Sequence, residues 1–128
     1  MIELGKKEPY VGKENKLQES VINWLRYSGY YCFHVPNGGK RDEKTGAMFK
    51  RQGVLAGVSD VIILDNVMDI PSMVNYKGIA IELKNKTGKV SDAQKDFMVN
   101  AEKRGFLVIL AWNFSDLIEY FEKNIRML

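Results

Sequence analysis

The sequence predicts a single α/β domain whose mixed four-stranded sheet is flanked by helices, in the order α-β-β-β-α-β-α. Four short apolar runs are rich in Ile, Val and Leu and end at Gly, Asn, Asp or Pro, which is typical of strands. Three longer segments repeat apolar residues at spacings of three and four, as amphipathic helices do. The length of 128 residues allows one hydrophobic core and not two.

Composition narrows the class of protein. Apolar residues make up 45% of the chain and charged residues 27%, which are ordinary values for a globular protein. No apolar run approaches the ~20 residues of a membrane span, and the N-terminus lacks the apolar centre of a signal peptide, so we expect a cytoplasmic protein.

Cys32 is the only cysteine and is expected to be buried, and His34 is the only histidine, which excludes a multi-histidine metal site. The net charge of +3 is compatible with a nucleic-acid partner but does not demonstrate one.

The first helix follows a loose arm over residues 1–12. It is expected over 13–28 and ends at Gly29, where a glycine can terminate a helix. The stripe expected to be buried is Leu17, Val21, Trp24, Leu25 and Ser28. Glu14 extends this stripe toward the helix start, whereas Glu19 falls beside it. Glu14 therefore either faces a functional site or is a first-turn acid of the kind that suits a helix N-terminus.

A strand is expected over residues 30–35, and a long basic connection follows it. Pro36-Asn37-Gly38-Gly39 ends the strand, and a short helix is expected over 47–52. Long connections in compact domains are often functional, and basic residues among glycines suit a phosphate backbone. The alternative is an ordinary solvent-exposed loop. The candidate DNA contacts are Asn37, Lys40, Arg41, Lys50 and Arg51, together with Lys86 from a later loop.

The next two strands are expected over 58–64 and 78–84, joined by a polar connection with a hairpin tip over 65–77. The first has apolar residues on both faces and should be central in the sheet. In the second, side chains alternate between faces. Ile79, Ile81 and Leu83 should point into the core, and Ala80, Glu82 and Lys84 to the other side.

The remaining elements are a helix over 91–104, a strand over 106–112 and a last helix that Ser115 caps and that runs through Ile125. Ser91 and Gln94 form a capping-box pattern at the start of the first of these helices. The Gln94 amide either caps that helix or contacts Lys84 or a phosphate. Three consecutive strands favour antiparallel pairing, and a helical crossover makes the last strand parallel to its neighbour.

Two acidic residues occupy strand positions where apolar residues would be expected. Asp60 opens one strand and Glu82 closes the next, so their side chains lie close together if the strands pair about 4.8 Å apart. Two carboxylates beside Lys84 suit a divalent cation held by oxygen ligands. Taken alone, Glu82 and Lys84 could equally be a solvated ion pair.

These motifs together resemble the PD-(D/E)xK nuclease superfamily, and within it the VRR-NUC family, which also includes phage proteins. The resemblance covers residues 14–110, and it implies a restriction-endonuclease-like core in one nuclease domain over 13–128. The motifs are Glu14-x-x-Leu17-Gln18, Pro36-Asn37-Gly38-Gly39, Gly57-Val58-Ser59-Asp60, Ile81-Glu82-Leu83-Lys84 and Gln94. Ser59 stands where the superfamily often has proline, a residue that is not a ligand.

The resemblance implies phosphodiester hydrolysis that depends on Mg²⁺ or Mn²⁺. It assigns Asp60, Glu82 and the Leu83 main-chain carbonyl to the metal, with Glu14 completing the shell and Glu19 as the alternative position for this carboxylate on the first helix. It assigns Lys84 to orienting the attacking water or offsetting transition-state charge, and adds Gln94 to the catalytic residues. Such families act on branched DNA, including flaps and four-way (Holliday) junctions, often as homodimers, here in the host cytoplasm if the protein is phage-encoded.

Two other classes of function remain open on the sequence alone. One is a non-catalytic nucleic-acid-binding module that retains the nuclease fold. The other is an interaction protein in which Glu82 and Lys84 are a surface pair. Binding alone does not need two carboxylates facing a phosphate, so the presence of Asp60, Glu82 and Lys84 together favours the enzyme.

Overall fold

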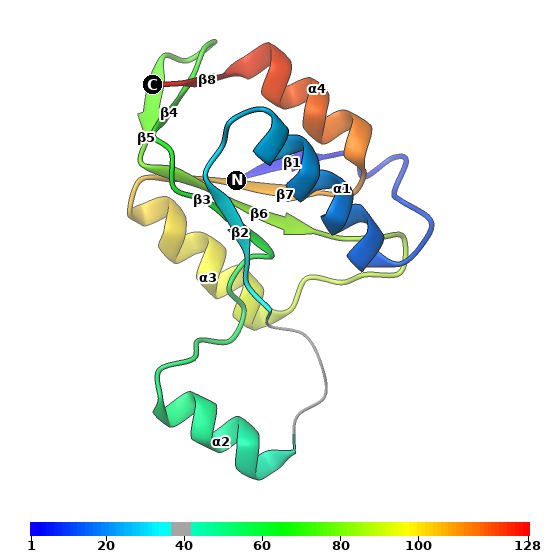
Figure 1. The fold of residues 1–128 in the computed structure, drawn as a ribbon, viewed down its shortest axis with the longest axis vertical. Helices are drawn as coiled ribbons and strands as arrows, with labels where there is room; N and C mark the ends of the chain where they lie inside the picture. Colours follow the sequence, from blue (N-terminus) through cyan, green and yellow to red (C-terminus); the bar gives the residue numbers. More distant parts are fainter. Residues whose placement is uncertain (37–41) are drawn as a thin grey trace.

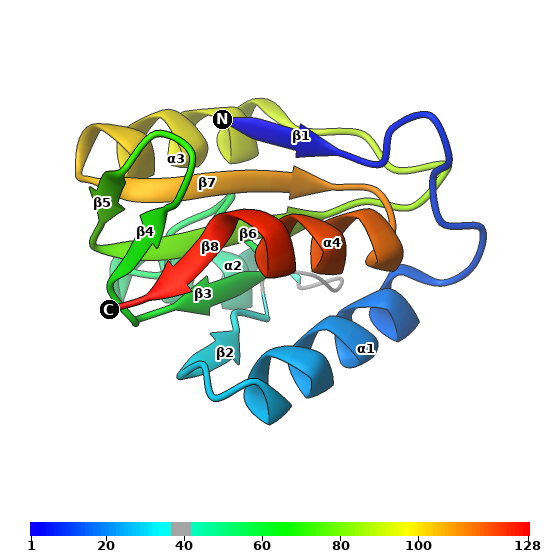
Figure 2. The same ribbon diagram turned by 90° about the horizontal axis from the view of Figure 1, so that it is seen from above.

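The computed structural model describes residues 1–36 and 42–128, and these form a five-stranded sheet with helices on both faces (Figure 1). Seen from above, α3 covers one face of this sheet and α1 and α4 lie on the other (Figure 2). The helices are α1 (Glu14–Tyr27), α2 (Glu43–Arg51), α3 (Asp92–Lys103) and α4 (Phe114–Asn124). In spatial order the strands of the large sheet are β1 (Ile2–Leu4), β7 (Phe106–Ala111), β6 (Gly78–Leu83), β3 (Val61–Ile63) and β2 (Cys32–His34).

Strand pairing in the centre of the sheet confirms the predicted mixed α/β architecture. β2, β3 and β6 pair antiparallel, and β7 runs parallel to β6 after the crossover through α3. Ile81 is the partner of Val61 on one side and of Ile109 on the other. This pairing brings the start of β3 beside the end of β6, which is where the two acidic residues lie.

The prediction of a loose arm over residues 1–12 is wrong for Ile2–Leu4. These residues form β1, which pairs in parallel with the outer edge of β7. The Met1 amine also lies 2.8 Å from a carboxylate oxygen of Glu102 on α3. Three residues are too few to show strand periodicity, so the sequence carries no signal for this edge strand.

A second, smaller sheet was not predicted. The hairpin expected after β3 is present as β4 (Val67–Asp69) and β5 (Val74–Tyr76), and β4 also pairs with β8 (Ile125–Met127). The last helix therefore ends at Asn124, and Ile125 belongs to a strand. The N-cap of this last helix, α4, is Asn113 and not Ser115, because the Asn113 side-chain oxygen accepts a hydrogen bond from the Asp116 amide at 2.8 Å.

The two faces of β6 pack into different cores, as the alternation predicts. Ile79, Ile81 and Leu83 join the larger core beneath α1 and α4, and Ala80 packs with Met98 and Val108 beneath α3. The stripe predicted for α1 is buried at Leu17, Val21 and Leu25. Trp24 is only partly buried, and Ser28, the C-cap of the helix, is exposed. Cys32 is buried as predicted, and burial raises the pKa of its thiol.

Helix α2 begins earlier than predicted and stands apart from the body of the molecule (Figure 1). The helix was expected over 47–52, but the Asp42 carboxylate caps it by accepting a hydrogen bond from the Thr45 amide at 2.6 Å. The two strands on either side of this connection, β2 and β3, are shorter than the strands expected over 30–35 and 58–64. In the described parts of the chain, no helix has the length and apolar character needed to span a membrane.

Candidate active site

The two strand-borne acids meet at one end of the β3–β6 pair. Asp60 directly precedes β3, and its Oδ2 accepts a hydrogen bond from the Leu83 amide at 2.8 Å. Leu83 follows Glu82 along β6, so Asp60 is fixed against the strand that carries the second carboxylate. The structure thus brings Asp60 and Glu82 together, as the sequence suggested, and the Leu83 contact that it shows is made by the main-chain amide and not by the carbonyl.

Glu82 is only 1% exposed, which is unusual for a carboxylate. Its Oε1 accepts a hydrogen bond from Gln94 Nε2 at 2.9 Å and lies 3.6 Å from Lys84 Nζ. Its Oε2 is buried and, in the ionised form, has no hydrogen-bond partner among the described residues. A buried charged oxygen without a partner is costly, so this atom needs either a proton or a cation.

The electrostatics of the site lead to the same conclusion. Burial raises the pKa of Glu82 to about 9, and the neighbouring carboxylates of Asp60 and Glu14 add to the shift, whereas Lys84 opposes it. When Glu82 is protonated it can share its proton with Asp60. The site therefore contains more negative groups than one lysine neutralises, which is the condition that a bound cation relieves.

Glu14, in the first turn of α1, approaches the same cluster. Burial raises the pKa of its carboxyl group, Lys84 lowers it and Asp60 raises it. A Cβ placed on Gly88 would lie 3.0 Å from Lys84 Cδ and 3.3 Å from Glu14 Oε2, so a glycine there lets the loop after β6 pass close to both. Glu19, the alternative position, instead lies 3.7 Å from exposed Lys16.

These residues fit a hard cation with oxygen ligands. Outside residues 37–41, no three acidic, cysteine or histidine side chains are grouped so that together they could hold a metal ion. Mg²⁺ does not need such a group, because it usually keeps several waters and takes one or two carboxylates. The unpartnered Glu82 oxygen beside Asp60 is the feature that matches such a cation.

Gln94 caps α3, as one of its two predicted roles required, and it also contacts the site through a different atom. Its side-chain oxygen Oε1 accepts a hydrogen bond from the Ser91 main-chain amide at 2.9 Å. Its main-chain amide donates to Ser91 Oγ at 3.1 Å, which completes the capping box of α3. Its Nε2 is then available to donate to Glu82. The partner in the site is Glu82 and not Lys84 or a phosphate, as had been expected.

Two residues beside the site were not singled out from the sequence as part of it. His34 Nδ1 lies 2.7 Å from the Asp60 main-chain oxygen, and a carbonyl can only accept, so this nitrogen carries the proton. Ser59 is fully buried, and its hydroxyl has no partner within the described residues. The position of His34 opposite Val61 depends on strand register, which the sequence does not state.

The structure describes three of the six predicted DNA contacts, and two of these lie away from the carboxylates. Lys50 and Arg51 are exposed on the last turn of α2, away from the body of the molecule. Lys86 is exposed on the loop that follows β6, and its amide is anchored to the Tyr10 main-chain oxygen at 2.8 Å. Asn37, Lys40 and Arg41 lie outside the described residues.

The sheet, its helices and the acid–lysine cluster at the strand ends define a protein with a nuclease fold. The chain belongs to the VRR-NUC domain family, whose model matches residues 12–112. It is also similar to a solved structure described as "VRR_NUC domain protein", with 26% sequence identity and a TM-score of 0.68 over 88% of this chain and 87% of that one. No curated protein matches the sequence significantly. The family and the mixed α/β fold predicted from the sequence are therefore confirmed.

Proposed function

We propose that this protein is a metal-dependent, structure-selective endonuclease that hydrolyses phosphodiester bonds in branched DNA. The observation that carries the proposal is the buried Glu82 carboxylate, whose Oε2 has no partner among the described residues and which lies beside Asp60 and Lys84. Membership of the VRR-NUC family supports nuclease chemistry and a nucleic-acid substrate. A purely structural ion pair does not explain the additional acids at this site.

In this proposal Asp60, Glu82 and the Leu83 carbonyl hold Mg²⁺ or Mn²⁺, and Glu14 approaches from α1. A bound ion of this kind stabilises charge on a phosphoryl oxygen and lowers the pKa of a water. Asp60 is positioned for this role by the Leu83 amide, and Glu82 by Gln94. Both carboxylates are thus oriented before any ligand arrives, which reduces the reorganisation needed during the reaction.

Lys84 is the second functional group of the proposed mechanism. Its side chain is largely buried, with its ammonium group 3.6 Å from Glu82 Oε1. A cation at this position can orient the attacking water or offset the negative charge that grows on the phosphoryl oxygens. A non-catalytic module has no need for a lysine confined at this depth.

The preferred substrate in this proposal is branched DNA, either a flap or a four-way junction, cut by a homodimer. Two identical active sites related by a two-fold axis are the simplest arrangement for symmetric cuts in two strands. Lys50, Arg51 and Lys86 are the proposed phosphate contacts in the described part of the chain. Asn37, Lys40 and Arg41 stay proposals from the sequence.

The test compares linear duplex, flap and four-way junction DNA of matched length, each with Mg²⁺ or with a chelator. We expect cleavage of a branched substrate that requires Mg²⁺ and is absent in Asp60→Asn, which keeps an oxygen to accept from the Leu83 amide. Equal cleavage by Asp60→Asn would remove Asp60 from the mechanism. Salt-sensitive binding of all three DNAs without any cleavage would favour the non-catalytic module.

A further inference from the structure

Two loops lie side by side at the end of the sheet where Asp60 and Glu82 meet. The first, residues 5–13, joins β1 to α1, and the second, residues 84–91, joins β6 to α3. Figure 1 and Figure 2 both show them next to each other, beyond the ends of β6 and β7. We refer to these two segments together as the paired loops.

Hydrogen bonds hold the paired loops against each other and against the sheet. The Lys86 amide donates to the Tyr10 main-chain oxygen at 2.8 Å, and Asn85 Nδ2 donates to the Gly12 main-chain oxygen at 2.7 Å. The Tyr10 amide donates in turn to the main-chain oxygen of Trp112, just beyond β7, at 2.7 Å. The arrangement of the two loops is therefore set before any ligand binds.

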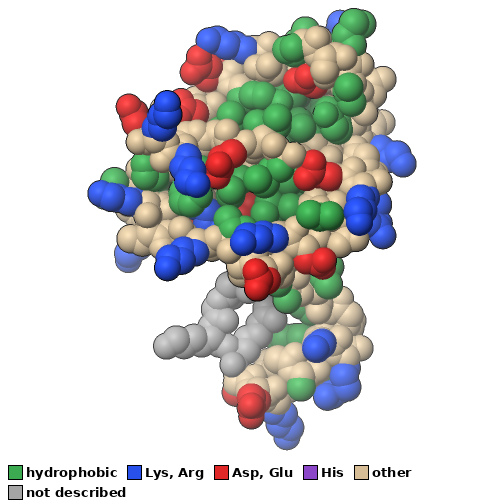
Figure 3. All heavy atoms as spheres, turned by 180° about the vertical axis from the view of Figure 1, so that it is seen from behind, with side chains coloured by type: hydrophobic (Ala, Val, Ile, Leu, Met, Phe, Trp, Pro, Cys, Tyr) green, Lys and Arg blue, Asp and Glu red, His purple; other side chains and the backbone are tan. Residues whose placement is uncertain are grey.

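Positive charge is concentrated in the paired loops. They contain six lysines and one glutamate, a net charge of +5, whereas the whole chain has a net charge of +3. Five of the lysines are exposed, namely Lys6, Lys7, Lys13, Lys86 and Lys89. None of these five forms an ion pair within the residues that the structure describes. Figure 3, seen from behind, shows Lys and Arg side chains on its left, the side where these loops lie. Like charges without partners repel one another, and a polyanion bound across them relieves this repulsion.

The basic surface adjoins the candidate active site. Lys13 directly precedes Glu14, which approaches the cluster from α1. Gly88 packs on the same cluster, since a Cβ there would lie 3.0 Å from Lys84 Cδ and 3.3 Å from Glu14 Oε2. Lys89 is the residue after Gly88, and consecutive Cα atoms are only about 3.8 Å apart. A phosphate backbone in contact with Lys13 and Lys89 therefore passes beside the carboxylates.

We propose that the paired loops bind the phosphate backbone of the DNA strand that is cut, with Lys13 and Lys89 as the contacts nearest to the cleaved bond. Lysine ammonium groups bind phosphates as point charges, and each contact releases counterions from the DNA. Such contacts fix the position of DNA without reading its sequence, which suits an enzyme that selects a DNA structure. This inference rests on the proposed function and specifies where its substrate lies.

The first test measures how salt affects the binding of uncut flap DNA in Ca²⁺, by fluorescence anisotropy. Changing Lys13 and Lys89 together to alanine should make the slope of log K against log salt shallower by ~2, one for each lost phosphate contact.

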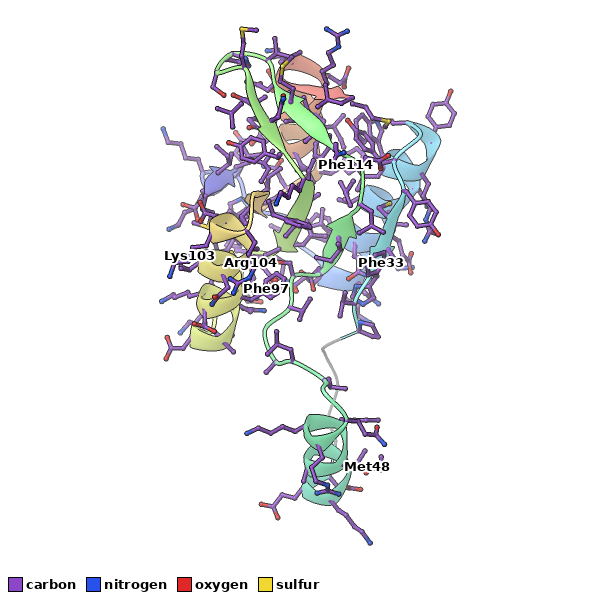
Figure 4. The ribbon with its side chains drawn as sticks, turned by 90° about the vertical axis from the view of Figure 1, so that its left-hand side faces the viewer. Phe33, Met48, Phe97, Lys103, Arg104 and Phe114 are labelled. Carbon is purple, nitrogen blue, oxygen red and sulfur yellow. The ribbon has the colours of Figure 1, made fainter. Side chains whose placement is uncertain are left out.

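The matched control changes Lys77 and Lys103 to alanine. Both are exposed, and they lie at the opposite end of the same elements, because Lys77 precedes β6 and Lys103 ends α3. Figure 4, which faces the side away from the paired loops, shows Lys103 on α3. The slope should be unchanged in this control. An equal fall in both double variants would indicate a general effect of net charge, and no fall with Lys13 and Lys89 would assign them to the solvent. Either result would overturn the proposal.

The second test locates the contact on the DNA. In a series of flap DNAs, one phosphate at a time is replaced by an uncharged methylphosphonate. At the phosphate that Lys89 contacts, this replacement should weaken binding of the wild type and leave binding of Lys89→Ala unchanged. We expect that phosphate to flank the bond that the wild type cuts in Mg²⁺. A series in which no phosphate responds in this way, or only one on a remote arm of the flap, would contradict the proposed contact.

The two proposals fail in different ways. The expected salt slopes and phosphate coupling without any cleavage in Mg²⁺ would support the DNA-binding surface and count against the proposed chemistry. Cleavage that requires Mg²⁺, with an unchanged salt slope in the Lys13 and Lys89 variant, would do the reverse. A wild-type protein that binds none of these DNAs would remove both.

Discussion

At the level of single residues, the buried Glu82 carboxyl group is the most unusual feature of the candidate site. It is buried by the packing of β6 between two cores, yet in the ionised form only one of its two oxygens has partners among the described residues, namely Gln94 and Lys84. Replacing Glu82 by glutamine keeps the shape of the side chain and removes the charge. The stability of this Glu82→Gln variant without metal therefore tests the electrostatic argument separately from catalysis.

Stability in the absence of metal should depend on pH through Glu82. Its pKa is about 9 in the folded protein and near 4.5 when unfolded, so the folded state holds a proton that the unfolded state has lost between these values. The stability that Glu82 contributes through this proton is fully present below pH 4.5 and is lost as the pH rises through 9. We expect the melting temperature with chelator to fall between pH 5 and pH 9 more steeply in the wild type than in Glu82→Gln. Parallel curves in differential scanning calorimetry would contradict this.

Lys84 should act on turnover more than on binding. Because it is held beside Glu82, Lys84→Ala should lower the single-turnover cleavage rate by ~10² or more, a plausible loss for one positioned electrostatic group. Binding of uncut DNA in Ca²⁺ should change by less than tenfold, about 1.4 kcal/mol.

Lys86→Ala is the matched control for Lys84, since Lys86 is exposed on the same segment, past the strand end. It should lose little rate. If Lys84→Ala weakens binding and leaves the single-turnover rate intact, Lys84 is a phosphate contact. The proposed catalytic role of Lys84 would then be wrong.

At the level of elements, the first turn of α3 connects helix capping with the site. Gln94→Glu keeps a side-chain oxygen to accept from the Ser91 amide, because glutamate serves at this capping position as well as glutamine. It replaces the donor to Glu82 by a third nearby carboxylate. We expect α3 to remain formed while cleavage falls, measured by amide hydrogen exchange and by rate.

Gln94→Ala is the comparison for that variant, since it loses the acceptor for the Ser91 amide as well as the donor to Glu82. A lost hydrogen bond costs about 0.5–1.5 kcal/mol, so this variant should also be less stable. Full activity in Gln94→Glu would show that the hydrogen bond to Glu82 is not needed for catalysis.

The exposed end of α2 should contribute to DNA binding through charge alone. Changing Lys50 and Arg51 together to alanine removes two potential phosphate contacts, and the slope of log K against log salt should become shallower by ~2. Fluorescence anisotropy across a salt series measures this slope. Changing exposed Lys95 and Lys103 on α3 provides a control with the same loss of charge. An unchanged slope would assign Lys50 and Arg51 to the solvent.

The sequence predicted the elements with strong periodicity and missed those set by contacts distant along the chain. The alternation in β6 and the stripe of α1 were correct at Ile79, Ile81 and Leu17 because both report directly on burial. β1 was missed, as was the second sheet, because each depends on a partner strand far away in sequence. The proximity of Asp60 and Glu82 was predicted correctly, whereas the contact of His34 with Asp60 depends on the β2–β3 register.

For the whole molecule, a bound cation should stabilise the fold. Any ligand that binds only the folded state raises stability according to its concentration relative to Kd, by about 2.7 kcal/mol at a hundredfold excess. We expect Mg²⁺ to raise the melting temperature of the wild type at pH 8, with Mn²⁺ acting at lower concentration if it binds more tightly. Glu82→Gln should lose most of this shift, and an equal shift in that variant would place the cation elsewhere.

The hydrogen bond between the Asp60 carboxylate and the Leu83 amide can form only when β3 and β6 are paired in the correct register. It extends the β3–β6 ladder by one rung, with a side chain in place of a main-chain carbonyl. A slip of one residue would turn the side chains of β3 to the opposite faces and break this rung. Misaligned chains would therefore lose the paired acids together with the correct core, so only a correctly registered sheet can present the site.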